Sequence, residues 1–99
     1  LNLILGVMKD KDIQSILRLL APLAHHLILT RPHTERAAPP SLLLKALGKN
    51  GKKAEIVDDL EGAIGKGLSI TKEEDLLCIT GSLYTVGEAR AYFRPRERS

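Results

Sequence analysis

Short apolar runs alternate with segments of helical periodicity along the whole chain, and this alternation most constrains its fold. The clearest run, Leu3 to Val7, is almost continuously apolar, which is typical of a strand buried on both faces of a sheet. Strands alternating with helices predict βαβ units, and therefore a parallel sheet with helices on both faces. The expected strands cover residues 3–7, 26–30, 54–57 and 75–80, and the expected helices cover residues 13–20, 39–47, 60–68 and 83–93.

Polar residues and glycine mark where the helices begin and end. Asp10 or Asp12 can cap the first helix, and Asp58 or Asp59 can cap the third. A carboxylate suits these positions because it accepts hydrogen bonds from the free N–H groups of a helix N-terminus. Gly48 follows the second helix, where a glycine commonly ends a helix.

The order of the strands follows from the handedness of their connections. Right-handed crossovers leave few arrangements of four parallel strands, and the commonest places them in the order 3-2-1-4. We therefore expect a three-layer, Rossmann-like α/β fold with the first strand in the middle. Ligands of such sheets bind outside the carboxyl ends of the strands, where the chain direction switches. This rule places residues 8–12 beside residues 81–84 and predicts a binding site there.

The charge pattern argues against a nucleic-acid partner. The formal net charge is +3, but residues 94–99 carry three arginines and one glutamate, so the rest of the chain is nearly neutral. The chain also holds only two tyrosines and one phenylalanine as aromatic residues, whereas nucleic-acid binders usually show a basic face with interleaved aromatics. We expect one domain over residues 1–93 and a basic, disordered tail over residues 94–99.

The chain offers no pattern for a membrane span or a metal site. Its apolar runs are far shorter than the roughly 20 residues that a spanning helix needs. His25 and His26 are adjacent and point to different faces, and neither they nor His33 is joined by a cysteine or an acidic cluster, so no metal site is expected. Because the first residue is Leu1 instead of methionine, we expect a piece of a longer protein.

Cys78 is the only cysteine and can form no disulfide within the chain. A single free thiol fits a reducing compartment, so we expect a cytoplasmic location. The residue lies in the middle of the fourth expected strand. This position predicts an inert core side chain instead of a nucleophile.

Two segments at the predicted binding edge carry polar groups suited to chemistry. Residues 6–12 place two lysines and two aspartates at the end of the central strand, immediately before a helix. Residues 81–84 form a strand-to-helix turn in which Ser82 can cap the helix or offer its hydroxyl group to an anion. A capped helix start with solvated charges explains the first segment equally well.

Several motifs together resemble one known family. They are Gly-Val-Met-Lys-Asp-Lys-Asp-Ile at 6–13, Ile-Leu-Thr-Arg-Pro at 28–32, Arg-Ala at 36–37 and Thr-Gly-Ser-Leu-Tyr-Thr-Val-Gly-Glu-Ala-Arg at 80–90. In this order and spacing they resemble the C-terminal domain of folylpolyglutamate synthase/dihydrofolate synthase, in the Mur-ligase superfamily. The resemblance covers about residues 2–92.

The resemblance implies an ATP-dependent ligase, which activates a carboxylate as an acyl phosphate. The amino group of glutamate then attacks, and ADP and phosphate are released. The phosphate-binding loop and the Mg²⁺ ligands would belong to an N-terminal ATPase domain, so the 99-residue chain alone should be inactive. The implied partners are that domain, ATP, glutamate, and a folate or dihydropteroate, in a monomeric enzyme. Which folate form is used is left open.

The resemblance also implies a set of glutamate-binding residues. Ser82 and the backbone of Leu83 fall where related ligases hold a carboxylate of the amino-acid substrate. Lys9 or Lys11 falls where a lysine can meet that substrate. Arg36 falls where an arginine can clamp a carboxylate bidentately. The family's catalytic residues are not expected in this chain.

A second hypothesis needs no catalysis. A free-standing α/β module could bind a nucleotide or another small anion in the same crevice at the strand ends.

Overall fold

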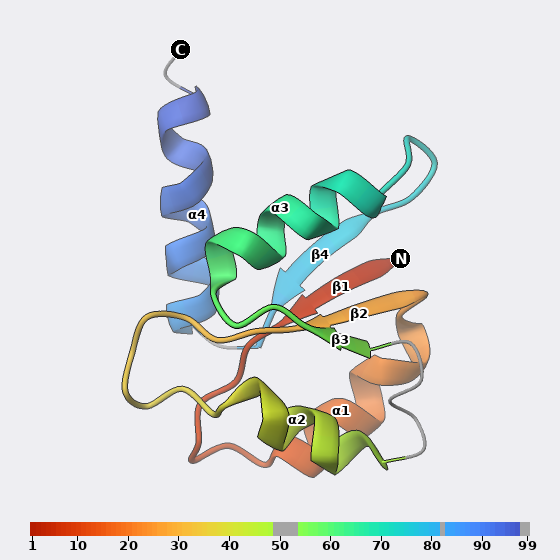
Figure 1. Ribbon diagram of the computed structural model, residues 1–99, viewed down its shortest axis with the longest axis vertical. Helices are drawn as coiled ribbons and strands as arrows, with labels where there is room; N and C mark the ends of the chain where they lie inside the picture. The colour runs from red at the N-terminus through yellow and green to blue at the C-terminus, as the bar shows by residue number, and fades with distance from the viewer. Residues whose placement is uncertain (49–53, 82, 98–99) are drawn as a thin grey trace.

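The computed structural model describes residues 1–48, 54–81 and 83–97 as a single sheet with helices on both faces (Figure 1). The strands run parallel in the order β3-β2-β1-β4, which confirms the predicted topology. The strands are β1 (Asn2–Leu5), β2 (His26–Leu29), β3 (Ala54–Ile56) and β4 (Leu77–Thr80). The helices are α1 (Ile13–Leu20), the 3₁₀ turn η1 (Ala21–Leu23), α2 (Pro40–Leu47), α3 (Leu60–Ile70) and α4 (Leu83–Glu97).

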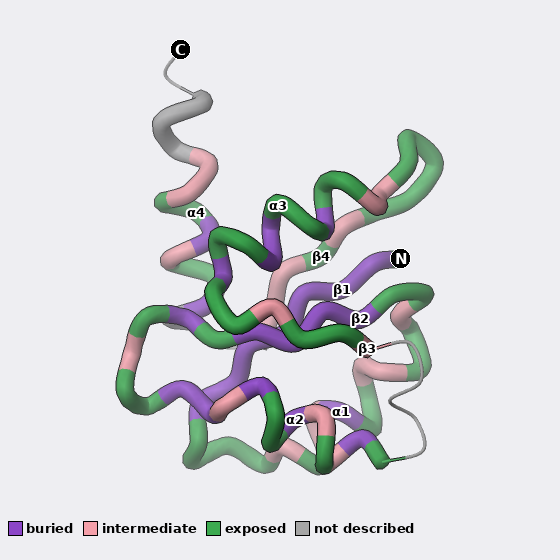
Figure 2. The backbone as a smooth tube through the Cα atoms, viewed as in Figure 1, coloured by how far each residue is buried: buried purple, intermediate pink, exposed green. Residues whose placement is uncertain are grey.

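The chain direction decides which face each helix covers. The connections from β1 to β2 and from β2 to β3 run the same way across the sheet, so α1 and α2 lie on one face. The connection from β3 returns to β4 at the other edge, so α3 crosses the opposite face, beside α4 (Figure 1). Right-handed crossovers require this arrangement. The burial pattern follows it, because the two middle strands, β1 and β2, are almost wholly buried, whereas β3 and β4 at the sheet edges are not (Figure 2).

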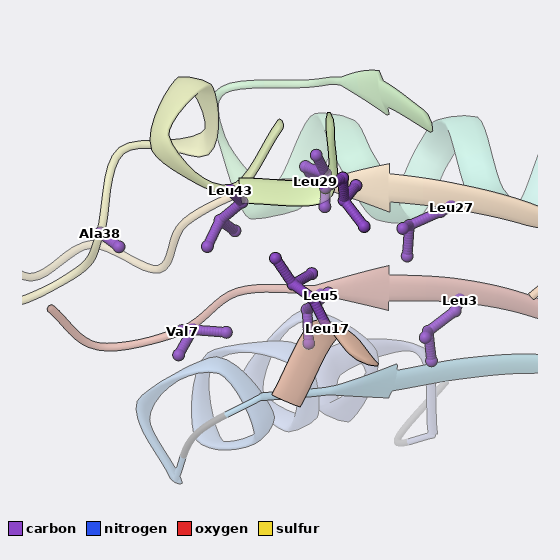
Figure 3. Close-up of a cluster of buried hydrophobic side chains, with 9 residues drawn as sticks. Leu3, Leu5, Val7, Leu17, Leu27, Leu29, Ala38 and Leu43 are labelled. Atoms are coloured by element: carbon purple, nitrogen blue, oxygen red, sulfur yellow. The ribbon is translucent and has the colours of Figure 1, made fainter. Parts of the chain in front are cut away.

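Alternating residues of the central strand supply two separate cores. Leu3 and Leu5 of β1 point toward α1 and α2, and Ile4 points toward α3 and α4. The buried residues of the first core include Leu17 of α1 and Leu43 of α2, which meet the strand side chains in Figure 3. The second core consists of Ile4, Ile28, Leu60, Ala63, Ile64 and Ala89. β1 is therefore buried on both faces, as its apolar run predicts.

The helix caps resolve the alternatives that the sequence left open. The carboxylate of Asp12 accepts from the backbone N–H of Ser15 and begins α1. Asp59 accepts from Gly62 and begins α3. Gly48 has a φ of 56° and ends α2, as expected for a residue that needs no side chain at a left-handed position.

The last helix is longer than its apolar stripe indicates. The described helix α4 continues from residue 93 to Glu97, into the segment for which the sequence predicts a tail. The division into a domain over residues 1–93 and a tail stays a prediction. None of the helices in the described ranges combines the length and the apolar character needed to cross a membrane.

Cys78 corrects one expectation, because its side chain is exposed instead of buried in the core. β4 lies at the edge of the sheet, and Cys78 pairs in register with Leu3, so it faces the layer of α1 and α2. Those helices pack against residues of β1, β2 and β3, whereas β4 contributes Leu77 and Ile79 to the core on the other face. A position in the middle of a strand implies burial only when helices cover both faces of that strand.

The exposed position of Cys78 predicts a reactive thiol in the folded protein. We expect a thiol reagent to modify native Cys78 within about tenfold of its rate in the unfolded chain, because thiol reactivity follows exposure. Cys78→Ala should change the free energy of unfolding by no more than about 0.5 kcal/mol. The control is Ile4→Ala in the covered strand, which should cost about 2–5 kcal/mol. Modification only after global unfolding would contradict the exposed position.

Candidate functional site

The carboxyl ends of the four parallel strands lie at one edge of the sheet, and the segments after β1, β2 and β4 are three of the four that begin there. Residues 6–12 follow β1, residues 30–39 follow β2, and Gly81 follows β4. Lys9, Lys11 and Arg36 lie in the first two segments.

Two further residues predicted for this site, Ser82 and Leu83, follow Gly81 in the sequence. Ser82 lies outside the described residues. Leu83 is described as the first residue of α4, which fixes the place of its backbone beside this edge.

A short antiparallel bridge joins the segments after β1 and β2. Met8 pairs with Ala37, the N–H of Lys9 donates to the carbonyl oxygen of Arg36 at 2.8 Å, and the N–H of Ala38 donates to that of Val7 at 2.8 Å. The side chains of Val7, Met8, Ala37 and Ala38 are buried. The bridge therefore has a packed apolar base, and it places Lys9 directly beside Arg36.

The charged side chains on this bridge remain in solvent. The guanidinium of Arg36 lies 3.7 Å from the carboxylate of Asp10, and both side chains are more than half exposed, at 65% and 61%. An ion pair in such a position contributes only about 0–1 kcal/mol. Arg36 can therefore exchange Asp10 for the carboxylate of a ligand at little cost.

The two candidate lysines occupy different places. Lys9 is exposed and bonded through its backbone to Arg36. Lys11 is also exposed, but it lies past a turn in which its N–H donates to the carbonyl oxygen of Met8 at 3.3 Å, toward the start of α1. The structure thus places the backbone of Lys9, and not that of Lys11, next to Arg36.

The segment after β4 packs directly on the end of β1. Gly81 has a φ of 129°, and a Cβ atom there would overlap the carbonyl group of Gly6. The hydroxyl group of Thr85, in the first turn of α4, donates to the same carbonyl oxygen at 2.8 Å. These contacts join Gly6, at the end of β1, to the turn after β4, whereas the predicted neighbourhood of residues 8–12 and 81–84 stays a prediction. Glycine is required at position 81 by both conformation and space.

Sequence reasoning missed two buried hydroxyl groups at this edge. Thr30 and Thr85 are each 0% exposed. Within the described part of the chain, Thr30 Oγ1 has no hydrogen-bond partner. The available signal was a threonine at the end of an apolar strand and another inside the last helix, and both residue types are too common at such places to indicate a role.

Two larger pockets are bounded by described residues, and neither is lined by Lys9 or Arg36. One, of about 440 Å³, follows β2 and β3, and the ion pair of Arg31 and Asp58, 2.9 Å long, lies on its wall. It is lined by Arg31, Pro32, His33, Thr34, Glu35, Asp58 and Asp59. A second, of about 330 Å³, lies between α3 and α4 and is lined by His33, Leu60, Glu61, Ile64, Glu88, Ala91 and Tyr92.

Metal-ligating groups do not gather in the described ranges. No cluster of three or more histidine, cysteine, aspartate or glutamate side chains there could hold a metal ion.

Comparison with known proteins gives consistent results. Residues 1–83 match the family described as Mur ligase, glutamate ligase domain. Over 85 residues the chain is 35% identical to the dihydrofolate synthase/folylpolyglutamate synthase of Buchnera aphidicola, covering 86% of this chain and 20% of that protein. The chain thus spans about a fifth of the length of this curated relative.

Two solved structures of similar enzymes also superpose on the chain. E. coli FolC in complex with DHPP and ADP is 25% identical, with a TM-score of 0.84 over 99% of this chain and 23% of that chain. Mycobacterium tuberculosis folylpolyglutamate synthase complexed with ADP is 28% identical, with a TM-score of 0.80 over 92% of this chain and 23% of that chain.

The cap of α1 gives a pH-dependent test of the segment after β1. The hydroxyl of Ser15, then its backbone N–H, and Arg18 lower the pKa of Asp12 below its ordinary value. A carboxyl whose folded pKa is lowered stabilises the fold above its unfolded pKa, and this stabilisation is lost as the pH falls through the folded value. We therefore expect the melting temperature of Asp12→Asn to fall less than that of the parent chain when the pH is lowered below about 4.

The matched control is Glu74→Gln, at an exposed carboxyl between α3 and β4. This control variant should lose stability in acid to the same extent as the parent chain. Identical pH profiles for the parent chain and Asp12→Asn would show that Asp12 does not stabilise the fold as a charged cap.

Proposed function

Because this chain belongs to the family of the Mur ligase, glutamate ligase domain, we propose that it is the C-terminal domain of an ATP-dependent folylpolyglutamate synthase/dihydrofolate synthase. In this proposal the domain binds the incoming glutamate at the carboxyl edge of its sheet. The observation that carries the assignment to this edge is the bridge that places Lys9 beside Arg36. The 35% identity to the Buchnera enzyme supports the choice of ligase.

The proposed reaction forms an amide bond. ATP phosphorylates a carboxylate of the folate or dihydropteroate substrate, the glutamate amine attacks the acyl phosphate, and ADP and phosphate leave. The phosphate-binding loop, the magnesium ligands and the catalytic residues would reside in the preceding ATPase domain. The residues of the present domain would bind and orient glutamate, so that its neutral amine faces the acyl group.

Charge complementarity supports glutamate as the ligand of this edge. Apart from its reacting amine, glutamate carries two carboxylates, and both need partners when water is removed. Arg36 offers a bidentate partner, and Lys9 a second positive charge next to it. The start of α4 at Leu83 supplies free N–H groups at the positive end of a helix dipole. Ser82, which precedes it, and Lys11 complete the proposed set.

Asp10 has a specific place in this arrangement. It neutralises Arg36 in the described structure at 3.7 Å, and both groups are exposed. A substrate carboxylate would take the place of Asp10 on the guanidinium. Asp10 thereby competes with the substrate for Arg36. Removing Asp10 should lower the KM for glutamate, whereas removing Arg36 should raise it.

Steady-state kinetics of the full-length ligase test the glutamate site. Arg36→Ala, Lys9→Ala and Ser82→Ala should each raise the KM for glutamate at least about tenfold, or roughly 1.4 kcal/mol, because a charged or hydrogen-bonding partner of a carboxylate is lost. The KM values for ATP and the folate should stay within about twofold. Arg18→Ala and Lys45→Ala remove equally exposed charges on α1 and α2 and serve as controls. Unchanged glutamate kinetics in all three site variants would refute the site.

The competing carboxylate provides a second test in the same assay. Asp10→Asn should lower the KM for glutamate by up to about fivefold, the upper range for losing an exposed ion pair. Asp10→Asn combined with Arg36→Ala should show no such decrease, since the competition acts through the guanidinium. A higher KM in Asp10→Asn would show that Asp10 holds Arg36 in its binding position instead of competing for it.

A further inference from the structure

Two polar side chains of α4 connect this helix to both loops of the candidate site. The Thr85 hydroxyl donates to the carbonyl oxygen of Gly6 at 2.8 Å, in a fully buried position. The Glu88 carboxylate accepts from the backbone N–H of His33 at 2.6 Å, at the surface. Residues three apart lie on the same side of a helix, so one side of α4 reaches the ends of two neighbouring strands.

Each contact point lies a few residues before a proposed glutamate ligand. Gly6 begins the segment that carries Lys9, and His33 lies three residues before Arg36. The same helix begins at Leu83, where the third part of the proposed site lies. The two hydrogen bonds therefore connect the three parts of the site through one rigid element.

The contact at Gly6 leaves no free space. A Cβ atom on Gly6 would lie 2.9 Å from Thr85 Oγ1 and 3.3 Å from Pro32, and a Cβ on Gly81 would overlap the Gly6 carbonyl. The end of β1 is thus enclosed by α4, by the loop after β2 and by the turn after β4. A displacement of α4 would therefore also disturb the loop after β2 and the turn after β4.

Apolar packing alone would not fix this spacing. Ala89 of α4 is buried in the second core, with Tyr92 and Phe93 packed against it, so the helix stays docked without the two hydrogen bonds. Burial of apolar surface is non-directional, however, whereas hydrogen bonds weaken steeply when their geometry is disturbed. Packing holds the helix on the sheet, and the two polar contacts set its position along the edge.

We propose that Thr85 and Glu88 are positioning residues of the glutamate site, which fix the start of α4 relative to the loops that carry Lys9 and Arg36. This inference rests on the proposed function. Neither residue touches the substrate; both act through the backbone of Gly6 and His33. Correct spacing matters because misplacing a substrate-binding group by about 1 Å can reduce the reaction rate on the order of 10²-fold.

The experiment compares Thr85→Val, Thr85→Ser and Glu88→Ala in the full-length ligase. Thr85→Val keeps the shape but removes the donor, and should raise the KM for glutamate at least about fivefold, with the KM for ATP within about twofold. Thr85→Ser restores the hydroxyl and should return the KM to within about twofold of the parent value. Glu88→Ala should also raise the KM for glutamate, and Glu74→Ala, at an exposed site away from this edge, should not.

A double substitution tests whether Thr85 acts through the site. In the Arg36→Ala background, Thr85→Val should raise the KM for glutamate less than it does in the parent enzyme, because residues that act through one another are not additive. Full additivity would overturn the inference. A merely structural role would lower the melting temperature and reduce all kinetic parameters together, without the split between glutamate and ATP, and would also overturn it.

The remaining outcomes separate this inference from the proposed function. If Arg36→Ala raises the KM for glutamate and both Thr85→Val and Glu88→Ala leave it unchanged, the positioning inference is wrong and the proposed function stands. If none of these three has an effect, and Lys9→Ala and Ser82→Ala also leave the KM for glutamate unchanged, the proposed glutamate site is wrong as well. If Thr85→Val does not fold, Glu88→Ala decides the question, because its hydrogen bond lies at the surface.

Discussion

The fold depends on one strand that is hydrogen-bonded on both sides and buried on both faces. β1 pairs with β2 and β4, its odd-numbered leucines enter the core under α1 and α2, and Ile4 enters the core under α3 and α4. Because its neighbours run parallel, they all end at the same edge as β1. The strand that holds the two cores together therefore also determines where the segments after β1, β2 and β4 meet.

That edge combines a rigid base with solvated charges. Buried residues on both sides of the Met8–Ala37 bridge fix the backbone of the two loops, whereas Lys9 and Arg36 project from it into solvent. Exposed charges interact weakly with one another in water, so little stabilisation is lost when a ligand displaces Asp10 from Arg36. A substrate whose carboxylates must be held in one orientation needs both properties, since the rigid base gives the geometry and the weakly paired charges give the attraction.

The family match and the polar contacts at the edge involve different parts of the chain. The family match covers residues 1–83, and these residues form all four strands and the first three helices. The remaining helix, α4, supplies Thr85 and Glu88, whose contacts with Gly6 and His33 hold the ends of β1 and the loop after β2. The proposed glutamate site is thus distributed over segments that only the folded sheet brings together.

The sequence by itself determined the fold class and the strand order, and from them it predicted the edge proposed for the site. Apolar periodicity, the positions of Asp12, Asp59 and Gly48, and the handedness of crossovers are local or general constraints, so they can be read without coordinates. Through family resemblance it also proposed one site, made of Arg36, Ser82, Leu83 and either Lys9 or Lys11.

Only the tertiary structure decided contacts between residues far apart in the chain. It showed that Cys78 is exposed at an edge strand, that Asp10 faces Arg36, and that Thr85 bonds to Gly6 across 79 positions of sequence. No periodicity encodes such contacts, because they depend on which helix covers which strand and on how closely two backbones approach. The side chains proposed to position the site therefore follow from packing, whereas its proposed location follows from the pattern of strands and helices.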